Sequence, residues 1–402
     1  MTYMKRGTKE FKKVNLALFA GGFCTFAILW GTQPLLPEIA KEFQISPAVS
    51  SLSQTSTTIA LAISLLIAGT LSEIYGRKRV MTISLVASSL LAVLTGLMPN
   101  LDLLITCRVL LGITLAGLPA VAMAYLGEEI DPKSLGMAIG LYISGNSFGG
   151  MAGRIISGIL TDYFGWRTAL TGIGIVSLAA TFIFWSLLPQ SANFKVQTFK
   201  LKQFGIGLFS HFKTPGLIHL FLIGFLLSAG FVSLYNYIGF QLINPPYSLS
   251  QTLVGFIFIV YIVGTFSSTW MGMFADQYGK IRMLLLSIII LIFGVCITLN
   301  LNLWIKMFGI AIFTFGFFAS HSIASSWVGR LAAQNKAQAA SLYLFSYYFG
   351  GSIVGTASGT FYSNFGWIGI VIMIAVLSTI SLLISIRLGM ISSRTIKLFN
   401  IQ

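Results

Sequence analysis

Charged side chains are scarce in this chain. Only 9% of its 402 residues are charged, whereas 56% are hydrophobic, and the mean hydropathy is +0.87. A soluble globular protein is about a quarter charged, and the 25 basic and 10 acidic side chains present could not cover a soluble surface of this size. This shortage excludes an ordinary soluble enzyme. Because about 20 apolar residues span a bilayer, the chain is long enough for twelve spans and their loops.

The sequence also has few cysteines and few motifs typical of metal or nucleotide sites. The three cysteines, Cys24, Cys107 and Cys296, lie separately inside apolar runs, which is typical of small buried hydrophobic residues rather than of disulfides or metal ligands. The sequence has no metal-ligand spacing, and no lysine follows a glycine loop as in phosphate-binding motifs. We therefore expect no metal, no cofactor, no ATP-driven step and no enzymatic activity.

The apolar residues gather in twelve runs, in two sets of six. The runs are residues 14–37, 49–72, 80–98, 103–126, 134–160, 167–189, 215–242, 250–275, 281–300, 303–327, 337–361 and 366–387. Residues 191–214 form the one long polar stretch between them and are the candidate cytoplasmic linker. The sequence therefore predicts an all-α polytopic membrane protein of twelve transmembrane helices, with one six-helix bundle in residues 1–190 and another in residues 215–402.

Most of the positive charge lies between the apolar runs. The net charge is +15, which on a soluble protein would suggest a nucleic-acid partner. With the N-terminus in the cytoplasm, 20 lysines and arginines lie on the cytoplasmic side and three on the opposite side. Because cytoplasmic loops are enriched in these residues, we expect a multi-pass protein of the inner (cytoplasmic) membrane. Both termini would be cytoplasmic, and no nucleic acid would bind.

The two sets of six runs are related in sequence. Residues 148–167 align with 349–368 at an offset of 201, with eight identities in twenty positions, and residues 69–79 align with 272–282 at an offset of 203. Paired glycines seven residues apart recur in all four segments, so a smaller unit also repeats within each half. Nested repeats of this kind are typical of secondary transporters.

The strongest local motif is GTLSEIYGRKR at residues 69–79. Its glycines permit a tight turn, its acidic side chain can face the positive end of a helix, and its basic triplet can pair with acidic residues at 128, 129 or 131. The motif resembles the signature loop of the major facilitator superfamily, which usually has Asp in place of Glu73. The resemblance implies gating; a simple positive-inside anchor is the alternative. The gating candidates are Gly69, Glu73, Gly76, Arg77, Asp276 and Gly279.

Two arginines lie inside predicted spans, where a charge is costly and usually functional. Arg108 resembles the helix-4 arginine that facilitator-type transporters associate with proton coupling; alternatively, it reaches the outer interface or pairs with Asp102. Arg154 lies among the glycines of residues 145–158, which resemble the glycine-rich helix-5 motif of the antiporter branch. These glycines are expected to pack this helix closely against a helix of the other half.

Four longer blocks, residues 140–158, 235–239, 317–327 and 341–351, resemble the YnfM-like inner-membrane transport proteins of the same superfamily. The resemblance spans nearly the whole chain and implies a permease of a kind often assigned to efflux. Polar and aromatic residues near the middle of the spans are the candidates for the substrate cavity: Trp30, Gln33, Asn146, Tyr235, Asn236, Tyr347 and Tyr348. The candidates for proton coupling are Arg108, Arg154, His321 and Glu38.

The acidic residues define the expected substrate. All ten lie at the ends of predicted spans or in loops, whereas exporters of lipophilic cations usually need a buried carboxylate to pair with the drug. We therefore predict a monomeric, proton-coupled exporter of a small neutral or anionic organic molecule, whose partners are the lipid bilayer, this substrate and protons. The alternatives are an exporter of lipophilic cationic drugs, a receptor that does not transport, and a lipid flippase.

Overall fold

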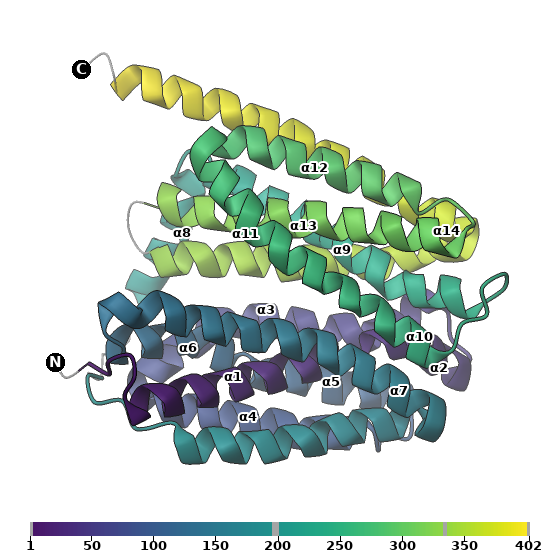
Figure 1. Cartoon of the computed structure of the whole chain (residues 1–402), viewed down its shortest axis with the longest axis horizontal. Coiled ribbons are helices and arrows are strands. Elements are labelled where there is room, and N and C mark those ends of the chain that lie inside the picture. Colours follow the sequence, from purple (N-terminus) through teal and green to yellow (C-terminus); the bar gives the residue numbers. More distant parts are fainter. Residues whose placement is uncertain (1–2, 195–200, 333–335, 400–402) are drawn as a thin grey trace. The chain divides into compact units, whose positions relative to one another are not determined.

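The computed structural model describes residues 3–194, 201–332 and 336–399, and these are almost entirely helical (Figure 1). The elements in chain order are α1 (Lys9–Trp30), η1 (Gln33–Leu35), α2 (Leu36–Phe43), α3 (Pro47–Tyr75), α4 (Arg77–Thr95), α5 (Leu101–Leu115), α6 (Gly117–Glu129), α7 (Pro132–Leu187), α8 (Leu201–Lys213), α9 (Leu217–Ile243), α10 (Gln251–Phe256), η2 (Ile257–Val260), α11 (Tyr261–Tyr278), α12 (Lys280–Ile297), α13 (Leu303–Leu331) and α14 (Lys336–Phe399). Part of the expected linker, residues 195–200, lies outside the described residues, and the rest of it contains α8.

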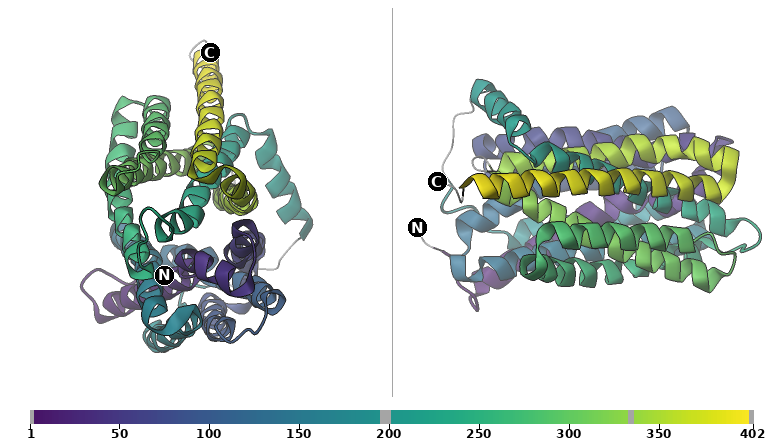
Figure 2. Two further views of the ribbon diagram at one scale, coloured as in Figure 1. Left: turned by 90° about the vertical axis from the view of Figure 1, so that its right-hand side faces the viewer. Right: turned by 90° about the horizontal axis from the view of Figure 1, so that it is seen from above.

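Two of the helices are pairs of spans joined at a glycine. The described residues contain ten stretches that are long and apolar enough to cross a membrane. Two of these, in α7 and α14, exceed 50 residues and break at Gly165 (φ 81°) and Gly366 (φ 61°), which have non-helical backbone angles. Figure 2 shows α14 turning back on itself. Counting α7 and α14 as two spans each gives the twelve that the sequence predicts.

The contacts divide the chain into two compact units. The first comprises residues 1–45, 49–199 and 248–258, and the second comprises residues 46–48, 200–247 and 259–402. The short segment 248–258 therefore packs with the first unit, although it follows α9 of the second unit in the chain.

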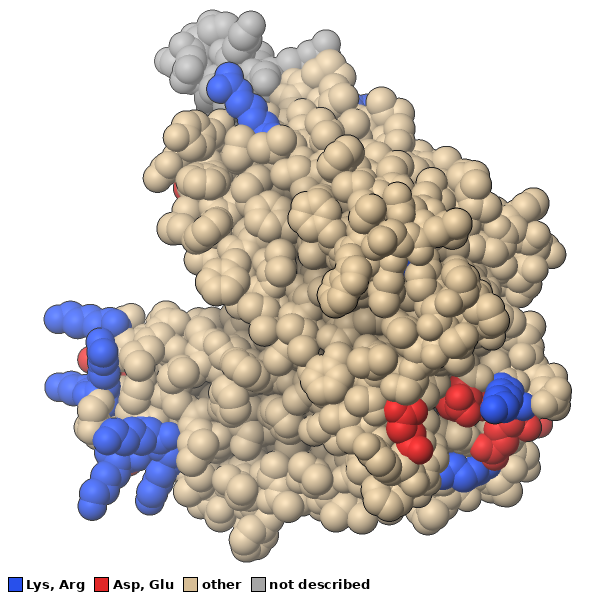
Figure 3. All heavy atoms as spheres, turned by 45° about the vertical axis from the view of Figure 1, so that its right-hand side comes forward, with Lys and Arg blue, Asp and Glu red and all other residues tan. Residues whose placement is uncertain are grey.

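In each unit, large apolar side chains remain exposed along the helices, among them Phe182 and Phe293. On the face shown in Figure 3, charged side chains gather at the ends of the helices, which suits a lipid environment.

Two clusters of buried apolar side chains contribute to the core of the first unit. One contains Leu18, Leu85, Tyr125, Tyr142 and Phe184, all at most 3% exposed. The other, at the opposite end of the helices, is formed by Leu35, Ile39, Leu104, Trp166, Ala169 and Leu170. Cys24 and Cys107 are buried as expected, but the expectation is wrong for Cys296, which is exposed. Its neighbour Val295 faces the core of the second unit, so the next residue along α12 points away.

Glycines set the spacing between α1 and α7. A Cβ on Gly145, Gly149 or Gly153 would clash with the backbone of α1 at Phe19, Phe23 and Ala27, respectively. The expectation that the motif packs against the other half is therefore wrong for these three glycines, which hold α7 against α1 of the same unit. It is confirmed for Gly158, where a Cβ would lie 2.6 Å from the Gln251 carbonyl of α10, a helix of the predicted second half. The repeat conserves the contact between α1 and α7, because a Cβ on Gly350 of α14 would clash with the backbone of Phe225 on α9.

We predict that Gly149→Ala destabilises the protein, because the added methyl would force α1 and α7 apart. Overpacking of this kind costs about 1–3 kcal/mol. The matched control is Gly140→Ala in the same helix, where a Cβ would have nothing within 4 Å. The melting temperature in detergent should fall for Gly149→Ala and stay unchanged or rise slightly for Gly140→Ala. Equal melting temperatures for the two variants would contradict this account of the α1–α7 contact.

Candidate functional site

Arg154 is the centre of the candidate site in the first unit. Its side chain is 1% exposed, and it lies on α7, which the glycines hold against the end of α1. The Arg154 Nε donates to Gln33 Oε1 at 2.9 Å, and Nη1 donates to the Gly150 carbonyl at 2.7 Å. The guanidinium lies 4.7 Å from the ring centroids of both Trp30 and Phe258. A buried cation is thus held by neutral oxygens and two aromatic faces.

The chain around this arginine explains why Trp30 and Gln33 reach it. Helix α1 ends at Trp30, and the backbone continues into the short 3₁₀ turn η1, which contains Gln33. Residues three positions apart share a face in either kind of helix, so both side chains lie on the side of Arg154. The structure thus unites three sequence candidates, Trp30, Gln33 and Arg154. Asn146 lies two turns earlier on α7, where it meets Gly22 of α1.

Arg108 is also buried, at 1% exposure, and connects three helices. Its Nε donates to the Ser53 carbonyl at 2.6 Å, and its Nη2 lies 3.4 Å from Gln54 Oε1. The Gln54 Nε2 donates in turn to the Leu29 carbonyl at 2.9 Å. The three ion pairs among the described residues do not include Arg108. The alternative in which it pairs with Asp102 or reaches the outer interface is therefore wrong.

The segment 248–258 is fastened to the first unit by two carboxylates. Asp162 accepts hydrogen bonds from the backbone N–H of Gln251 (3.0 Å) and Thr252 (2.7 Å), the first residues of α10. Glu38 accepts a hydrogen bond from Gln251 Nε2 at 3.3 Å. Since this segment also supplies Phe258, the two acids hold one wall of the Arg154 site in place. Sequence reasoning missed Asp162, because an acid at a span end reads as a simple interfacial charge.

Aromatic side chains dominate the candidate region of the second unit. Phe231 and Phe317 stack with ring centroids 3.7 Å apart, and Tyr235 lies 4.8 Å from Phe231. His321 lies 4.7 Å from the ring of Tyr347, and its Nδ1 lies 3.0 Å from Tyr343 Oη.

Three more contacts complete this second-unit cluster. Tyr235 Oη is 2.6 Å from Thr314 Oγ1, the rings of Tyr347 and Tyr348 are 5.2 Å apart, and Asn236 is 1% exposed on α9. The structure thus joins the candidates Tyr235, His321, Tyr347 and Tyr348 through aromatic residues that sequence reasoning missed. Their signal was the helical spacing of aromatics, as in Phe313, Phe317 and His321.

The gating candidates lie in the turns between α3 and α4 and between α11 and α12. Gly76 (φ 94°) and Gly279 (φ 96°) both have left-handed backbones, so the predicted tight turns are present. Arg77 makes a two-point ion pair with Glu128 at the end of α6, at 2.7 and 3.2 Å. Glu73 is half-buried near the end of α3, and a Cβ added to Gly69 would lie 4.0 Å from the Ala120 carbonyl.

In the second unit the acid lies near the turn and the base lies on the facing helix, the opposite of the first unit. Asp276, at the position of Glu73, pairs with Arg330, which stands at the position of Glu128 (2.9 Å). This second pair is more than half exposed, whereas the Arg77 side chain is 7% exposed. The loop–helix contact is therefore present in both units, but the buried, two-point version occurs in the first.

Comparison with known proteins agrees with the resemblance seen in the motifs. The sequence profile of the Major Facilitator Superfamily matches residues 18–244 and 220–399. The chain is 49% identical over 398 residues to the uncharacterized MFS-type transporter YybF of Bacillus subtilis, covering 99% of this chain and 98% of that protein. It is 45% identical over 386 residues to the inner membrane transport protein YnfM of Escherichia coli, covering 96% of this chain and 93% of that protein.

Solved transporter structures share the fold. A bacterial homolog of the human lysosomal transporter Spinster, in an inward-facing and occupied conformation, matches with a TM-score of 0.76 and 15% identity, over 96% of this chain and 98% of that one. The nucleoside transporter NupG matches with a TM-score of 0.76 and 16% identity, over 93% and 99% of the two chains. The chain therefore belongs to the Major Facilitator Superfamily and is a membrane transporter, not an enzyme.

Proposed function

We propose that this transporter exports a small neutral or anionic organic molecule by alternating access, driven by an inward flow of protons. The observation that carries the proposal is the buried guanidinium of Arg154, which Gln33, Gly150 and two aromatic rings hold in a membrane-spanning unit. A cation at such a depth is costly and usually has a function. An anionic group or a polar carbonyl of the substrate would be its natural ligand.

The positions of the charges support the same substrate class. Acidic residues lie at or near helix ends, as with Glu73 near the end of α3 and Asp276 near the end of α11. The repeat places Gly355 at the position of Arg154, so the shared scaffold does not require this arginine. A permanently cationic substrate would meet arginine where it needs a carboxylate.

Proton coupling has two candidate carriers. His321 lies in the aromatic cluster of the second unit, with Nδ1 3.0 Å from Tyr343 Oη, and imidazole is the side chain that most readily changes charge near neutral pH. Glu38 is half-buried and accepts its hydrogen bond from Gln251. Arg108 would act on the coupling through the α1–α3–α5 network rather than as a carrier, because a guanidinium keeps its proton.

The proposal includes the location of the protein and its orientation in the membrane. The chain is a monomer in the inner membrane with both termini cytoplasmic, since the loops on that side carry 20 of the 25 basic residues. Residues 1–190 and 215–402 form the two bundles that rock about the central site, and residues 191–214 link them. The relative YnfM, described as an inner membrane transport protein, supports this location.

The test is transport by the purified protein in liposomes under an imposed pH gradient. The wild type should transport at least one neutral or anionic solute of a panel that contains both kinds, and it should not transport a quaternary ammonium dye. Arg154→Ala should slow that transport about tenfold or more, because a hydrogen bond to a charged group contributes about 1.5–3 kcal/mol. The control is Arg167→Ala, which removes a charge from the same helix at the partly exposed pair with Glu42.

Other outcomes would favour the alternatives. Robust export of the dye, undiminished in Arg154→Ala, would refute the proposal in favour of an exporter of lipophilic cations. Binding of a solute without flux would favour a receptor, and movement of labelled phospholipid between leaflets would favour a flippase.

We further predict that Glu73→Gln shifts the population towards the inward-open state. The carboxylate of Glu73 would stabilise the outward-open state by facing the positive first turn of α14, near Lys336–Gln338. Turnover should therefore slow while substrate affinity stays the same, as measured by flux and by cysteine accessibility from the cytoplasmic side. Glu10→Gln, which neutralises an exposed acid at the start of α1, is the control. Unchanged turnover and accessibility in Glu73→Gln would remove this gating role.

A further inference from the structure

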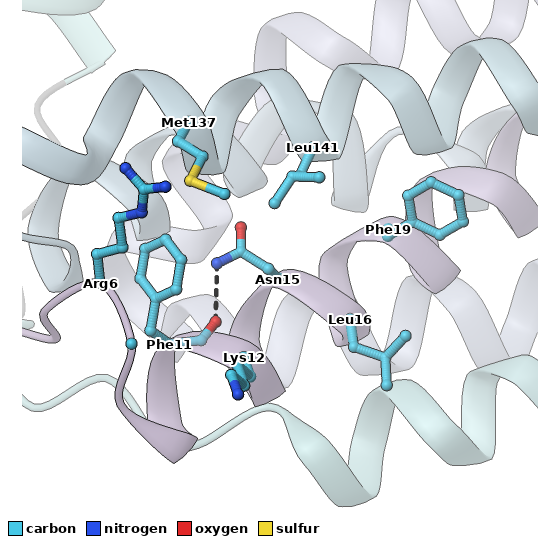
Figure 4. A pocket seen from close by; sticks show the side chains of 9 residues that line it. Arg6, Phe11, Lys12, Asn15, Leu16, Phe19, Met137 and Leu141 are labelled. Carbon is cyan, nitrogen blue, oxygen red and sulfur yellow. Dashed lines mark hydrogen bonds between the residues drawn. The ribbon is translucent and has the colours of Figure 1, made fainter.

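A separate cavity of about 490 Å³ lies between the start of α1 and the start of α7. Its walls are Phe11, Leu16, Phe19, Met137 and Leu141, and Figure 4 shows these side chains together with Arg6, Lys12 and Asn15. The volume falls in the range of ligand pockets, about 300–1,000 Å³. Leu16 is 55% exposed, so an apolar side chain leads from the cavity to the surface of the unit.

The chain before α1 is built to hold Arg6 at this cavity. The Met4 N–H donates to the Glu129 carbonyl at 2.8 Å, and the Asp131 N–H donates to the Met4 carbonyl at 3.1 Å. Gly7 then has a left-handed backbone (φ 93°), and Thr8 caps α1 by accepting from the Phe11 N–H at 3.2 Å. These contacts tie the segment to the end of α6 and leave the Arg6 side chain beside Met137 (Figure 4).

A polar atom without a partner faces the same cavity. Asn15 is 7% exposed, and its Nδ2 donates to the Phe11 carbonyl at 2.7 Å. A flipped amide would set two oxygens 2.7 Å apart with no hydrogen between them, so Nδ2 faces the carbonyl and Oδ1 lies on the cavity side (Figure 4). Among the described residues, Oδ1 has no hydrogen-bond donor. A buried acceptor left unpaired is costly, so the site is suited to a ligand that brings a hydroxyl or N–H group.

The charges define the rest of the ligand. Arg6 and Lys12 are exposed, and neither takes part in the three ion pairs among the described residues. Two cations beside apolar walls favour an amphiphilic anion over a soluble one, which would leave Phe11, Leu16 and Phe19 without an apolar partner. A zwitterionic head group would place its own ammonium next to these cations. An anionic head group that carries a hydroxyl satisfies Arg6, Lys12 and Asn15 together.

We infer that this cavity binds an anionic phospholipid whose head group bears a hydroxyl, such as a phosphatidylglycerol. Its phosphate lies on Arg6 and Lys12, its hydroxyl donates to Asn15 Oδ1, and an acyl chain follows Leu16 and Phe19 along α1. The inference rests on the proposed orientation, which places the N-terminal basic segment at the cytoplasmic leaflet, where clustered Lys and Arg bind anionic lipids.

The test measures lipid binding by the full chain in phosphatidylcholine nanodiscs doped with dioleoylphosphatidylglycerol, counted by native mass spectrometry. The double variant Arg6→Ala/Lys12→Ala should bind about tenfold more weakly or worse, since it removes the charge-assisted hydrogen bonds to the phosphate. The control is Lys9→Ala/Lys13→Ala, which removes the same charge from exposed positions of the same segment that do not line the cavity. This control should bind as the wild type does.

A second variant separates head-group recognition from charge. Asn15→Leu should lose the preference for phosphatidylglycerol over phosphatidylmethanol, which has the same charge and no hydroxyl. Equal losses in both double variants would overturn the proposal in favour of general surface attraction. Displacement of the bound phosphatidylglycerol by free glycerol 3-phosphate would overturn the proposal in favour of a soluble anion. Because lipid retention is read without any transported solute, its failure is distinguishable from failure of the proposed transport.

Discussion

The contact between the Arg154 guanidinium and its neutral cage is the constraint on which the first unit depends. In the apolar part of a membrane no water satisfies a buried donor, so the protein must supply the partners itself. Gln33, the Gly150 carbonyl and the faces of Trp30 and Phe258 do so. Each of these partners requires a feature elsewhere: the 3₁₀ turn after α1, the glycines that bring α7 to α1, and the segment 248–258 held by Asp162 and Glu38.

The two halves share a scaffold and differ in charge. Asn100 and Asn302 cap equivalent helices, yet the fourth residue after each is the core Leu104 in one half and the buried Lys306 in the other. The Lys306 ammonium lies 5.3 Å from the Trp367 ring centroid and donates to the Thr298 carbonyl.

The same division holds at the other positions that carry charge. Arg154 is replaced by a glycine in the second half, and the buried pair of Arg77 by an exposed one. Duplication therefore accounts for the helices and their spacing, whereas the chemistry of each half is its own.

Sequence reasoning predicted the features that depend on local chemistry. The apolar runs gave twelve spans, Gly76 and Gly279 gave the tight turns, and Arg77 was expected to pair with the acidic end of α6. It was wrong about the partner of Gly145, Gly149 and Gly153. A membrane helix is apolar on every face, so its periodicity does not say which neighbour a small-residue stripe will meet.

The long-range contacts were beyond reach for the same reason. Phe258 lies 104 positions after Arg154 in the sequence, in a segment that packs away from its own half. The aromatic cluster around Phe231 and Phe317 reads as ordinary membrane helix until the fold brings the rings together. Sequence identified the buried arginines because charge is conspicuous in apolar runs, and it named Trp30 and Gln33 as cavity candidates. It could not show that these two side chains meet Arg154 or that Phe258 joins them.

The central claim is that Arg154 selects substrates by charge, and ligand-induced stabilisation of the purified protein tests it most directly, because a ligand that binds the folded state raises its melting temperature. Small organic acids and lipophilic quaternary ammonium compounds would be compared on the wild type and on Arg154→Gln, which keeps a hydrogen-bond donor and removes the charge. The account predicts that at least one organic acid raises the melting temperature of the wild type and not of the variant, and that the cations raise neither. Stabilisation by the cations that is equal in both proteins would contradict it.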